Sequence, residues 1–566
     1  MDVGTISLVL MLGLIALLAI GMPLGFASAF MAVVVLFMKF EPALLADPTL
    51  WGEGFLTGRP GSGPLNILSQ RIYGDVMTSY VLISIPLFIF MAALLERSGI
   101  ARSMYDSLNV WLNRTRGGIA IVTSIMAVIM AAMSGIIGGE VVLLGLIALP
   151  QMLRLGYNQN LAIGTICASG SLGTMIPPSI VLIIYGLITE TSIKALFTAS
   201  FIPGFMLASF IIIYIMIRTR LNNTLAPLPE ERLNNELAAA ENPEQRAMVE
   251  RELAELAAQP QGNEKRMLFA ALLTVLVAGF WTFFTIRVLF FEFSGQNAAQ
   301  TGDPIRFGTM DYLPWFAGTV VVALGLIFGV FGRERTALAW SMGKGLVPPI
   351  IIIGVVLGSI YMGITGITEA AGMGALSVLV LAILRGEFTF DLLWDALMRT
   401  LKSTGTIIWV TIGATALAGA YTIAGGPTYV ANLILGTDVA TMGIILIMML
   451  ILLFMGAFMD WVGIVLLIIP VFLPIVQRLP IEEIGLLGEL QPKYLAVWFG
   501  VLFCMNMQVS FLSPPFGPAA FYLKSVAPPH ISLTDIFKGF LPFICIQLCA
   551  LSVLLIWPPI VEILLP

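Results

Sequence analysis

The sequence predicts an all-α polytopic membrane protein made of two repeats that face opposite sides of the bilayer. Composition is the first observation: of 566 residues, 58% are hydrophobic and only 11% are charged, whereas soluble domains carry about 25% charged residues. The second is that apolar runs of about 20 residues, enough to span a bilayer as a helix, recur from Ile6 onward. A soluble fold is therefore excluded, and at least about ten crossings are expected.

Residues that usually bind metals are few and scattered. The four cysteines lie within apolar runs, and the single histidine, His530, has no cysteine or histidine beside it. Neither a zinc or haem site nor a disulfide framework is therefore expected. The net charge is -5, and the basic stripe that nucleic-acid binding requires is missing. We expect no cofactor and no nucleic-acid partner.

Two long apolar stretches, residues 4–40 and 346–384, are each expected to form two short crossings. A glycine-rich segment interrupts each of them, Gly21–Gly25 in the first and Gly363–Gly366 in the second. The first stretch has no basic segment before it and is longer than a signal-peptide core, so it is expected to stay in the mature protein. Each stretch precedes an amphipathic arm expected along the membrane interface, residues 41–75 and 385–402.

Each half carries an acidic residue inside an apolar run. Glu140 follows a glycine-rich segment and precedes Pro150 by ten residues, and Asp460 precedes Pro470 by the same spacing. The matched spacing indicates an internal duplication. An ionisable group within the bilayer costs about 3 kcal/mol or more, which makes both acids functional candidates. A structural role stays open, because each carboxylate can instead cap the second half-helix of a hairpin.

Flanking charges place the two acid-bearing runs on opposite sides of the membrane. Arg97 and Arg154 belong to the basic segments around the first run, which is therefore expected to enter and leave from the cytoplasm as a re-entrant hairpin. Asp438 and Glu482 belong to the acidic flanks of the run around Asp460, which indicates the periplasmic side. The repeats are therefore inverted, and both termini are expected in the periplasm.

Breaks in the helices mark the expected site. Pro177-Pro178 and Pro514-Pro515 precede Tyr185 and Tyr522 by the same eight residues. Backbone that is not helical at membrane depth is tolerated only where protein or a polar cavity satisfies its polar groups. In inverted-repeat carriers such breaks meet near the midplane, where half-helix ends attract an anion and free carbonyls bind Na⁺. Four breaks are expected to meet there: 134–140, 169–178, 456–463 and 506–518.

An insertion, residues 221–335, separates the halves. Its Ala- and Glu-rich part, residues 230–258, lacks spanning hydrophobicity and is expected to form a cytoplasmic surface helix. Two further crossings are expected at 267–291 and 313–331. The chain thus divides into 1–116 (scaffold helices and first arm), 117–218 (first hairpin and discontinuous helix), 219–335 (insertion), 336–424 (scaffold helices and second arm) and 425–566 (second hairpin, discontinuous helix and last helix).

At these positions the sequence resembles the large membrane subunit of tripartite ATP-independent periplasmic (TRAP) transporters, over about residues 1–218 and 336–566. The motifs that carry the resemblance are Gly21–Ala27, Ile85–Phe88, Ser134-Gly135, Ile176–Ser179 with Tyr185-Gly186, Thr368–Ala371, Asp460, Asn506 and Ser513–Pro515.

The resemblance implies an inverted-repeat, elevator-type transporter of the ion-transporter superfamily, with two re-entrant helical hairpins and two discontinuous helices carried against a static scaffold. It also implies Na⁺-coupled uptake of an organic acid, a carboxylate, across the bacterial inner membrane without ATP. The implied partners are a small TRAP membrane subunit and a periplasmic substrate-binding protein.

The resemblance also assigns residues to the site. Those expected to bind sodium lie at the hairpin tips and broken-helix motifs: Ser134, Gly135, Gly138, Gly173, Thr174, Pro177, Asp460, Asn506 and Pro514. The other polar residues and prolines at the breaks are expected to contact the substrate: Glu140, Ser169, Ser171, Pro178, Ser179, Gln508, Ser513 and Pro515. The first hairpin departs from the family's Ser-Gly-Ser tip through Ile136-Ile137 and Gly139-Glu140, which indicates a pocket unlike the dicarboxylate type.

Two alternative functions stay open. A stand-alone Na⁺/carboxylate symporter or exchanger of the same fold would need no periplasmic partner. An intramembrane hydrolase would use Glu140 and Asp460 as a carboxylate pair, but both acids lie at glycine-rich tips without a nucleophile or metal ligand beside them. The sequence does not name the carboxylate, since no arginine clamp is visible in the core. Whether the insertion widens the scaffold or contacts the small subunit is likewise open.

Overall fold

The computed structural model describes residues 1–40, 68–135, 137–240, 242–293, 313–436, 439–457, 459–515 and 517–565. Regular structure within these ranges is helical. Nine of the described helical segments are long and apolar enough to cross a membrane, and five shorter helices are also apolar. The predicted all-α polytopic fold is thus confirmed. Most of the first predicted arm, residues 41–67, lies outside the described residues, as do Ile136 and Asp438.

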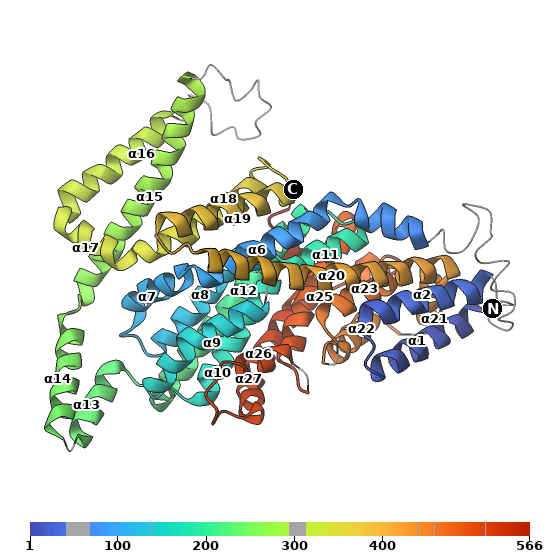
Figure 1. The fold of residues 1–566 in the computed structure, drawn as a ribbon, viewed down its shortest axis with the longest axis horizontal. Helices are drawn as coiled ribbons and strands as arrows, with labels where there is room; N and C mark the ends of the chain where they lie inside the picture. The colour runs from blue at the N-terminus through green and yellow to red at the C-terminus, as the bar shows by residue number, and fades with distance from the viewer. Residues whose placement is uncertain are drawn as a thin grey trace.

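The first half contains two N-terminal helices, an arm, a hairpin and a discontinuous helix (Figure 1). Its elements are α1 (Val3–Ala19), α2 (Leu24–Phe40), η2 (Arg71–Met77), η3 (Tyr80–Ile83), α6 (Ser84–Arg97), α7 (Ile100–Leu112), α8 (Gly118–Ser134), α9 (Ile137–Arg154), α10 (Gln159–Gly170), η4 (Ser171–Thr174), α11 (Ile180–Thr189) and α12 (Ile193–Leu221).

The second half repeats this order of elements from yellow to red in Figure 1. Its elements are α18 (Val347–Tyr361), α19 (Ile367–Leu384), α20 (Phe390–Ala424), α21 (Gly426–Leu435), α22 (Thr441–Gly456), α23 (Trp461–Leu467), α24 (Ile469–Val476), α25 (Leu495–Leu512), α26 (Pro518–Lys524) and α27 (Leu533–Ile556).

Both broken apolar stretches fold into the helix pairs that the sequence predicts. Gly21 lies in the turn between α1 and α2 with φ 87°, and Gly363 lies in the turn between α18 and α19 with φ 70°. Glycine adopts this left-handed conformation without the strain that a side chain adds. The two glycine-rich breaks therefore set the reversals that pair α1 with α2 and α18 with α19.

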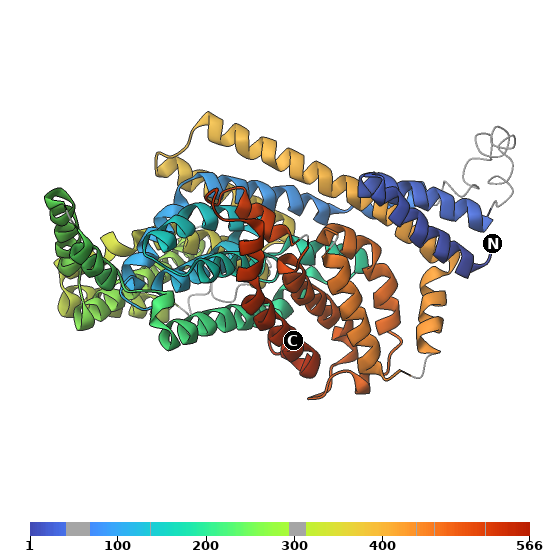
Figure 2. The same cartoon turned by 90° about the horizontal axis from the view of Figure 1, so that it is seen from below.

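The second arm differs from the prediction. Residues 390–402 do not form a separate interfacial segment, because α20 continues without a break to Ala424 and is 35 residues long. At 1.5 Å per residue it is about 52 Å long, well above the roughly 30 Å of a bilayer core. Figure 2 shows α20 running along one edge of the molecule. It packs against α2 and α6, so it joins the N-terminal pair to α6.

The insertion also differs in part from the prediction. Two surface helices, α13 (Pro229–Ala239) and α14 (Pro243–Ala258), replace the single one expected. Pro243 explains the division, because proline starts a helix readily but disfavours helical geometry in the residue before it. The expected crossings are present as apolar helices, and the elements that follow α14 are α15 (Gly262–Phe293), α16 (Leu313–Gly325), η8 (Leu326–Phe331), α17 (Arg333–Gly343) and η9 (Lys344–Leu346).

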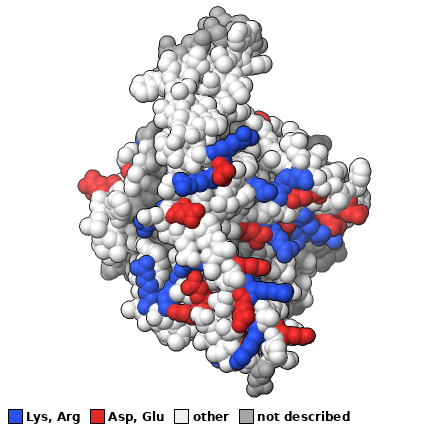
Figure 3. Space-filling view, turned by 90° about the vertical axis from the view of Figure 1, so that its left-hand side faces the viewer, with Lys and Arg blue, Asp and Glu red and all other residues white. Residues whose placement is uncertain are grey.

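Charged side chains gather at the end of the molecule where α13, α14 and α17 lie. Figure 3 shows this end with basic and acidic groups interspersed, and an uncharged lobe above it formed by α15 and α16. Two ion pairs tie α13 to the loop before α8: Arg116 with Glu231 at 2.5 Å, and Arg114 with Glu230 at 3.6 Å. The insertion is therefore fastened to the segment that leads into the first hairpin.

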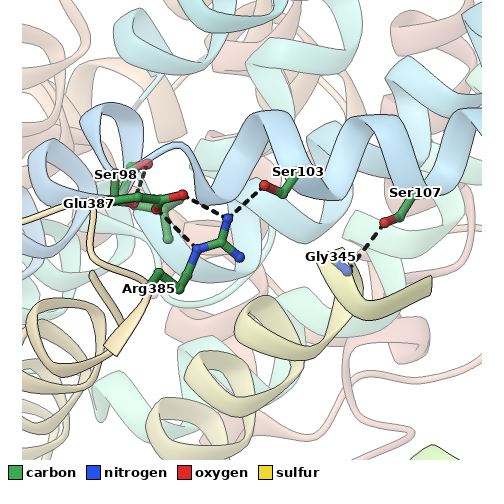
Figure 4. Close-up of polar contacts among 7 residues, drawn as sticks. Ser98, Ser103, Ser107, Gly345, Arg385 and Glu387 are labelled. Atoms are coloured by element: carbon green, nitrogen blue, oxygen red, sulfur yellow. Dashed lines mark hydrogen bonds and ion pairs between the residues drawn. The ribbon is translucent and has the colours of Figure 1, made fainter. Parts of the chain in front are cut away.

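A polar cluster holds α7 against the second half (Figure 4). Arg385, between α19 and α20, donates to the Ser103 hydroxyl and pairs with Glu387, at 2.7 and 2.8 Å. One turn along α7, the Ser107 hydroxyl accepts from the Gly345 amide at 3.2 Å. The cluster fixes the helix that precedes the first hairpin to both η9 and the start of the second arm.

Candidate functional site

The first hairpin turns at a position that only glycine can occupy. α8 ends at Ser134, and Gly135 follows in the left-handed region with φ 62°. A Cβ at Gly135 would lie 2.3 Å from the carbonyl oxygen of Pro178. The hairpin tip therefore packs directly on the backbone of the first discontinuous helix, as the sequence predicts for two breaks that meet.

Polar groups of the first discontinuous helix form hydrogen bonds with one another across its break. α10 tightens into η4, and the chain is then non-helical until α11 begins at Ile180. Ser179 caps α11 by accepting from the Leu182 amide at 3.5 Å, and its hydroxyl donates to the Thr174 carbonyl at 2.6 Å. The Pro177-Pro178 peptide bond within this break is cis.

Glu140 lies between the first hairpin and the first discontinuous helix. Its side chain is buried, with 1% exposure, and Oε1 accepts a hydrogen bond from the Ser134 hydroxyl. A Cβ at Gly173 would lie 2.9 Å from the same oxygen, so the carboxylate rests on η4. Within the described residues Oε2 has no hydrogen-bond partner. The contact with Ser134 replaces the capping of α9 amides that the sequence left open.

The second hairpin packs on the second discontinuous helix in a similar way. A Cβ at Gly456, where α22 ends, would lie 2.2 Å from the Ser510 hydroxyl on α25. Asp460 occupies the N-cap position of α23, but its exposed carboxylate makes no capping hydrogen bond of good geometry. Asn506 donates to the Met449 carbonyl at 2.7 Å, which ties α25 to α22. Its amide oxygen has no partner in the described part of the chain.

Two buried glutamines bond to η4, in the first of these breaks. Gln508 on α25 donates to the Thr174 hydroxyl in η4, and Gln547 on α27 donates to the Ser171 hydroxyl at 3.3 Å. Sequence reasoning missed Gln547, although an amide inside the apolar run of the last helix is a usable signal. Among described residues, four buried side-chain oxygens that only accept hydrogen bonds lack a donor here: Glu140 Oε2, Asn506 Oδ1, Gln508 Oε1 and Gln547 Oε1.

Unpartnered buried oxygens are costly unless something else satisfies them. Hard cations take carboxylate, amide and backbone oxygens as ligands. The oxygens around the two breaks therefore fit Na⁺, whereas histidine and cysteine clusters that hold transition metals are missing from the described residues.

A cavity of about 290 Å³ lies between the hairpins and two further helices, α6, which follows the first predicted arm, and α20, which contains most of the second. The first repeat contributes Gly135, Gly138 and Thr174 to its wall, and the second contributes Asp460. Residues from both repeats thus face one shared space. The other lining residues are Ile89 on α6, Ile180 and Val181 on α11, Ser403, Thr406 and Ile407 on α20, Trp461 and Val462 on α23, Phe511 on α25 and Tyr522 on α26.

The structure places the sequence-derived site residues in two groups. Four of the expected sodium ligands, Gly135, Gly138, Thr174 and Asp460, line the cavity. Those outside its lining are Ser134, Gly173, Pro177, Asn506 and Pro514. The expected substrate contacts also lie outside it: Glu140, Ser169, Ser171, Pro178, Ser179 and Gln508 are buried in the protein, and Ser513 and Pro515 follow α25. The roles of all these residues stay predictions.

Sequence reasoning also missed the wall formed by α20. Ser403 and Thr406 are ordinary hydroxyl residues in the sequence, and nothing local marks them as neighbours of Asp460. Tyr522 was noted only for its spacing from the proline pair, yet its ring lies against Gly138, where a Cβ would approach it to 3.0 Å. Only the packing of α20 and α26 on the hairpins reveals these contacts.

Sequence comparisons with known proteins point to one family. Residues 11–560 match the family model described as the DctM component of the tripartite ATP-independent periplasmic transporter. The chain is 24% identical over 488 residues to the C4-dicarboxylate TRAP transporter large permease protein DctM of Pseudomonas aeruginosa, covering 86% of each chain. It is 22% identical over 499 residues to the 2,3-diketo-L-gulonate TRAP transporter large permease protein YiaN of Escherichia coli, covering 88% of this chain and 89% of that one. The solved YdaH transporter of Alcanivorax borkumensis is similar with a TM-score of 0.47 and 14% identity, over 87% of each chain.

Proposed function

The chain belongs to the DctM family of TRAP transporter large permeases, and from this premise we propose that it carries out Na⁺-coupled uptake of an organic acid delivered by a periplasmic binding protein. The observation that carries the proposal is the cavity shared by both repeats. It brings the Gly135 tip of the first hairpin and Asp460 of the second hairpin to one space. A carboxylic acid of a few carbon atoms matches its volume of about 290 Å³, which lies at the small end of ligand pockets.

The cavity has features that suit an anion together with a cation. Ile180 and Val181, the first residues of α11, line it, so the positive end of this half-helix faces the space. The exposed carboxylate of Asp460 would repel an anionic substrate there. Na⁺ bound beside Asp460 removes that repulsion, and this gives a physical reason for ion binding to precede substrate binding.

The position of the cavity between two sets of elements supports an elevator mechanism. The hairpins and discontinuous helices form one wall, and α6 and α20 form the other. In the proposed elevator mechanism the first set slides as a unit along the arms and carries substrate and Na⁺ across the inner membrane. The polar cluster around Arg385 supports a static role for the second arm, since it ties the start of α20 to α7.

The partners are part of the proposal. A small TRAP membrane subunit would join this chain in the bacterial inner membrane, and a periplasmic binding protein would bring the substrate. One relative, the isethionate TRAP transporter permease protein DctMQ of Oleidesulfovibrio alaskensis, extends well beyond this chain, which covers 68% of its length.

Reconstitution in proteoliposomes tests the function. The chain is combined with the small subunit and binding protein encoded beside it, and uptake of radiolabelled succinate and N-acetylneuraminate is measured with an inward gradient of NaCl or of choline chloride, without ATP. We expect accumulation of one acid only with Na⁺ and all three proteins. Accumulation in choline chloride contradicts Na⁺ coupling, and Na⁺-driven uptake without the binding protein favours the stand-alone symporter.

A further inference from the structure

The scaffold side of the cavity carries a polar face that continues past the cavity lining. Ser403 and Thr406 line the cavity from α20, and Arg399 lies one turn before Ser403 on the same helix face. Four residues correspond to about 6 Å along the helix axis, within reach of an arginine side chain. The Ser403 hydroxyl makes no hydrogen bond to any described residue, whereas the Thr406 hydroxyl already donates to the Lys402 carbonyl at 3.0 Å.

The partner of Arg399 lies at the same edge of the cavity. Its guanidinium pairs with Glu96 near the end of α6, the helix whose Ile89 lines the cavity. A Cβ at Gly139 would collide with the Glu96 carboxylate, and Gly139 is next to the lining residue Gly138. The ion pair therefore sits where α6, α20 and the first hairpin meet.

The two members of this pair differ in exposure. The side chain of Glu96 is 15% exposed, whereas that of Arg399 is 48% exposed. An arginine has five N–H donors, and Nη1 is the nitrogen that bonds Glu96. The other N–H donors of the exposed guanidinium can therefore bind a second acceptor while Nη1 keeps its bond to Glu96.

A second ion pair joins the same two helices farther from the cavity and serves as a comparison. Arg97 pairs with Asp395 at 2.7 Å, with side-chain exposures of 49% and 47%, and also joins α6 to α20. Asp395 lies one turn further from Ser403 than Arg399 does. The pairs are similar in chemistry and differ in distance from the cavity, so Arg97 is a matched control.

We propose that Arg399, together with Ser403, binds the carboxylate of the substrate at the α20 side of the cavity. A guanidinium binds a carboxylate through two parallel hydrogen bonds, a geometry that lysine or a hydroxyl alone does not provide. Asp460 and the unpartnered oxygens lie on the hairpin side, so the anion and Na⁺ are bound at opposite walls. This assignment rests on the proposed function and adds a residue of the static arm to the binding site in the conformation described here. The contact is released when the hairpins and discontinuous helices slide and carry the substrate away from α20.

Ligand-dependent thermal stability of the purified complex tests the assignment. The melting temperature is measured against succinate and N-acetylneuraminate in NaCl and in choline chloride, for the wild type, Arg399→Gln and Arg97→Gln. We expect Arg399→Gln to raise the half-saturating concentration of the acid at least tenfold while that of Na⁺ changes less than twofold. Arg97→Gln should leave both unchanged.

A double variant separates anion binding from the loss of the ion pair. Arg399→Gln alone leaves Glu96 without its partner, whereas Glu96→Gln/Arg399→Gln leaves no unpaired carboxylate. We expect weak acid binding in the double variant as well, and restored binding overturns the assignment. Wild type that binds neither acid contradicts the proposed function and this inference together. Wild type that binds with Na⁺, while Arg399→Gln binds equally well, contradicts the inference alone.

Discussion

Gln508 donates a hydrogen bond to the hydroxyl of Thr174, and this contact joins the two discontinuous helices across 334 residues of sequence. Both side chains are buried. Thr174 also lines the cavity. The contact therefore makes the position of a cavity residue in the first repeat depend on the second repeat, which is what a site shared by two repeats requires.

Replacing Gln508 by alanine tests this dependence. The change leaves the buried Thr174 hydroxyl without its donor, and we expect a loss of about 1–3 kcal/mol in the free energy of unfolding. We also expect weaker Na⁺ dependence of uptake, because η4 loses a support. Thermal unfolding in detergent and the Na⁺ concentration for half-maximal uptake measure the two effects. Ser552→Ala is the control, since its hydroxyl bonds only the Leu548 carbonyl of its own helix.

Gly135→Ala tests the close approach of the first hairpin to Pro178. An alanine there meets two obstacles, the left-handed backbone and a carbonyl oxygen 2.3 Å from the new Cβ. Backbone strain alone costs about 1–3 kcal/mol. We expect transport to fall at least tenfold in the proteoliposome assay, because the tip must shift.

Gly386→Ala separates the two causes. Gly386 has φ 71°, and nothing lies within 4 Å of a Cβ built on it. The variant therefore carries the backbone strain without the collision. If Gly386→Ala lowers transport as much as Gly135→Ala does, the close packing of hairpin and discontinuous helix is not what matters.

The ion pair between Arg116 and Glu231 predicts a response to acid outside the membrane. A hydrogen bond from the Leu228 amide, and then the Arg116 guanidinium, lower the pKa of Glu231 below its ordinary value. A lowered folded-state pKa adds stability above the unfolded pKa, which is about 4.3 for glutamate, and this stability is lost as pH falls through the folded value. We expect α13 to become more susceptible to an acid protease as the pH drops below about 4.

Two variants check the source of that response. Glu231→Gln removes the carboxylate, so α13 should be cleaved more readily than in the wild type at the least acidic pH at which the protease acts, and should show a smaller further change at lower pH. Glu236→Gln removes the carboxylate that pairs with Arg232 within α13 itself, at 2.6 Å. It should leave the cleavage profile close to that of the wild type. Identical profiles for Glu231→Gln and the wild type would remove Glu231 from the explanation.

Local signals were sufficient for much of the fold. Gly21 and Gly363 predicted two reversals because positive φ strongly favours glycine. The proline pairs marked the non-helical breaks that precede α11 and α26, because proline disfavours a continuing helix. The length of α20 was missed because its polar first half and apolar second half have different composition but no break between them. The division at Pro243 was visible in the sequence and was overlooked.

The site was only partly predictable, for a physical reason. Gly135, Gly138, Thr174 and Asp460 lie in backbone breaks, which leave a signature in residue type and spacing, and the resemblance to TRAP permeases assigned these residues to the site. The cavity wall on α20 depends instead on how one helix packs against the hairpins, and the sequence around Ser403 contains no trace of it. The contact of Gln547 with Ser171 likewise depends on how α27 packs on η4, although the amide in an apolar run was a signal that sequence reasoning could have used.

The buried carboxylate of Glu140 gives the last prediction. Its Oε2 has no partner among the described residues, and no described lysine, arginine or histidine forms an ion pair with it. A buried charge without a partner destabilises a fold, and a neutral side chain of the same shape removes that cost. In Na⁺-free buffer we therefore expect Glu140→Gln to raise the free energy of unfolding by about 1–3 kcal/mol, the usual cost of an unsatisfied buried polar group.

Na⁺ should make the wild type more stable than Glu140→Gln if the ion binds at the unpartnered oxygens. The wild type then gains stability with rising NaCl, whereas Glu140→Gln loses a charged ligand and gains less. Melting temperatures of both proteins in NaCl and in choline chloride at equal ionic strength measure the difference, and Asp460→Asn provides the comparison at the cavity wall. Parallel curves for the wild type and Glu140→Gln in the two salts would show that Na⁺ does not bind at Glu140, since general effects of salt act on both proteins alike.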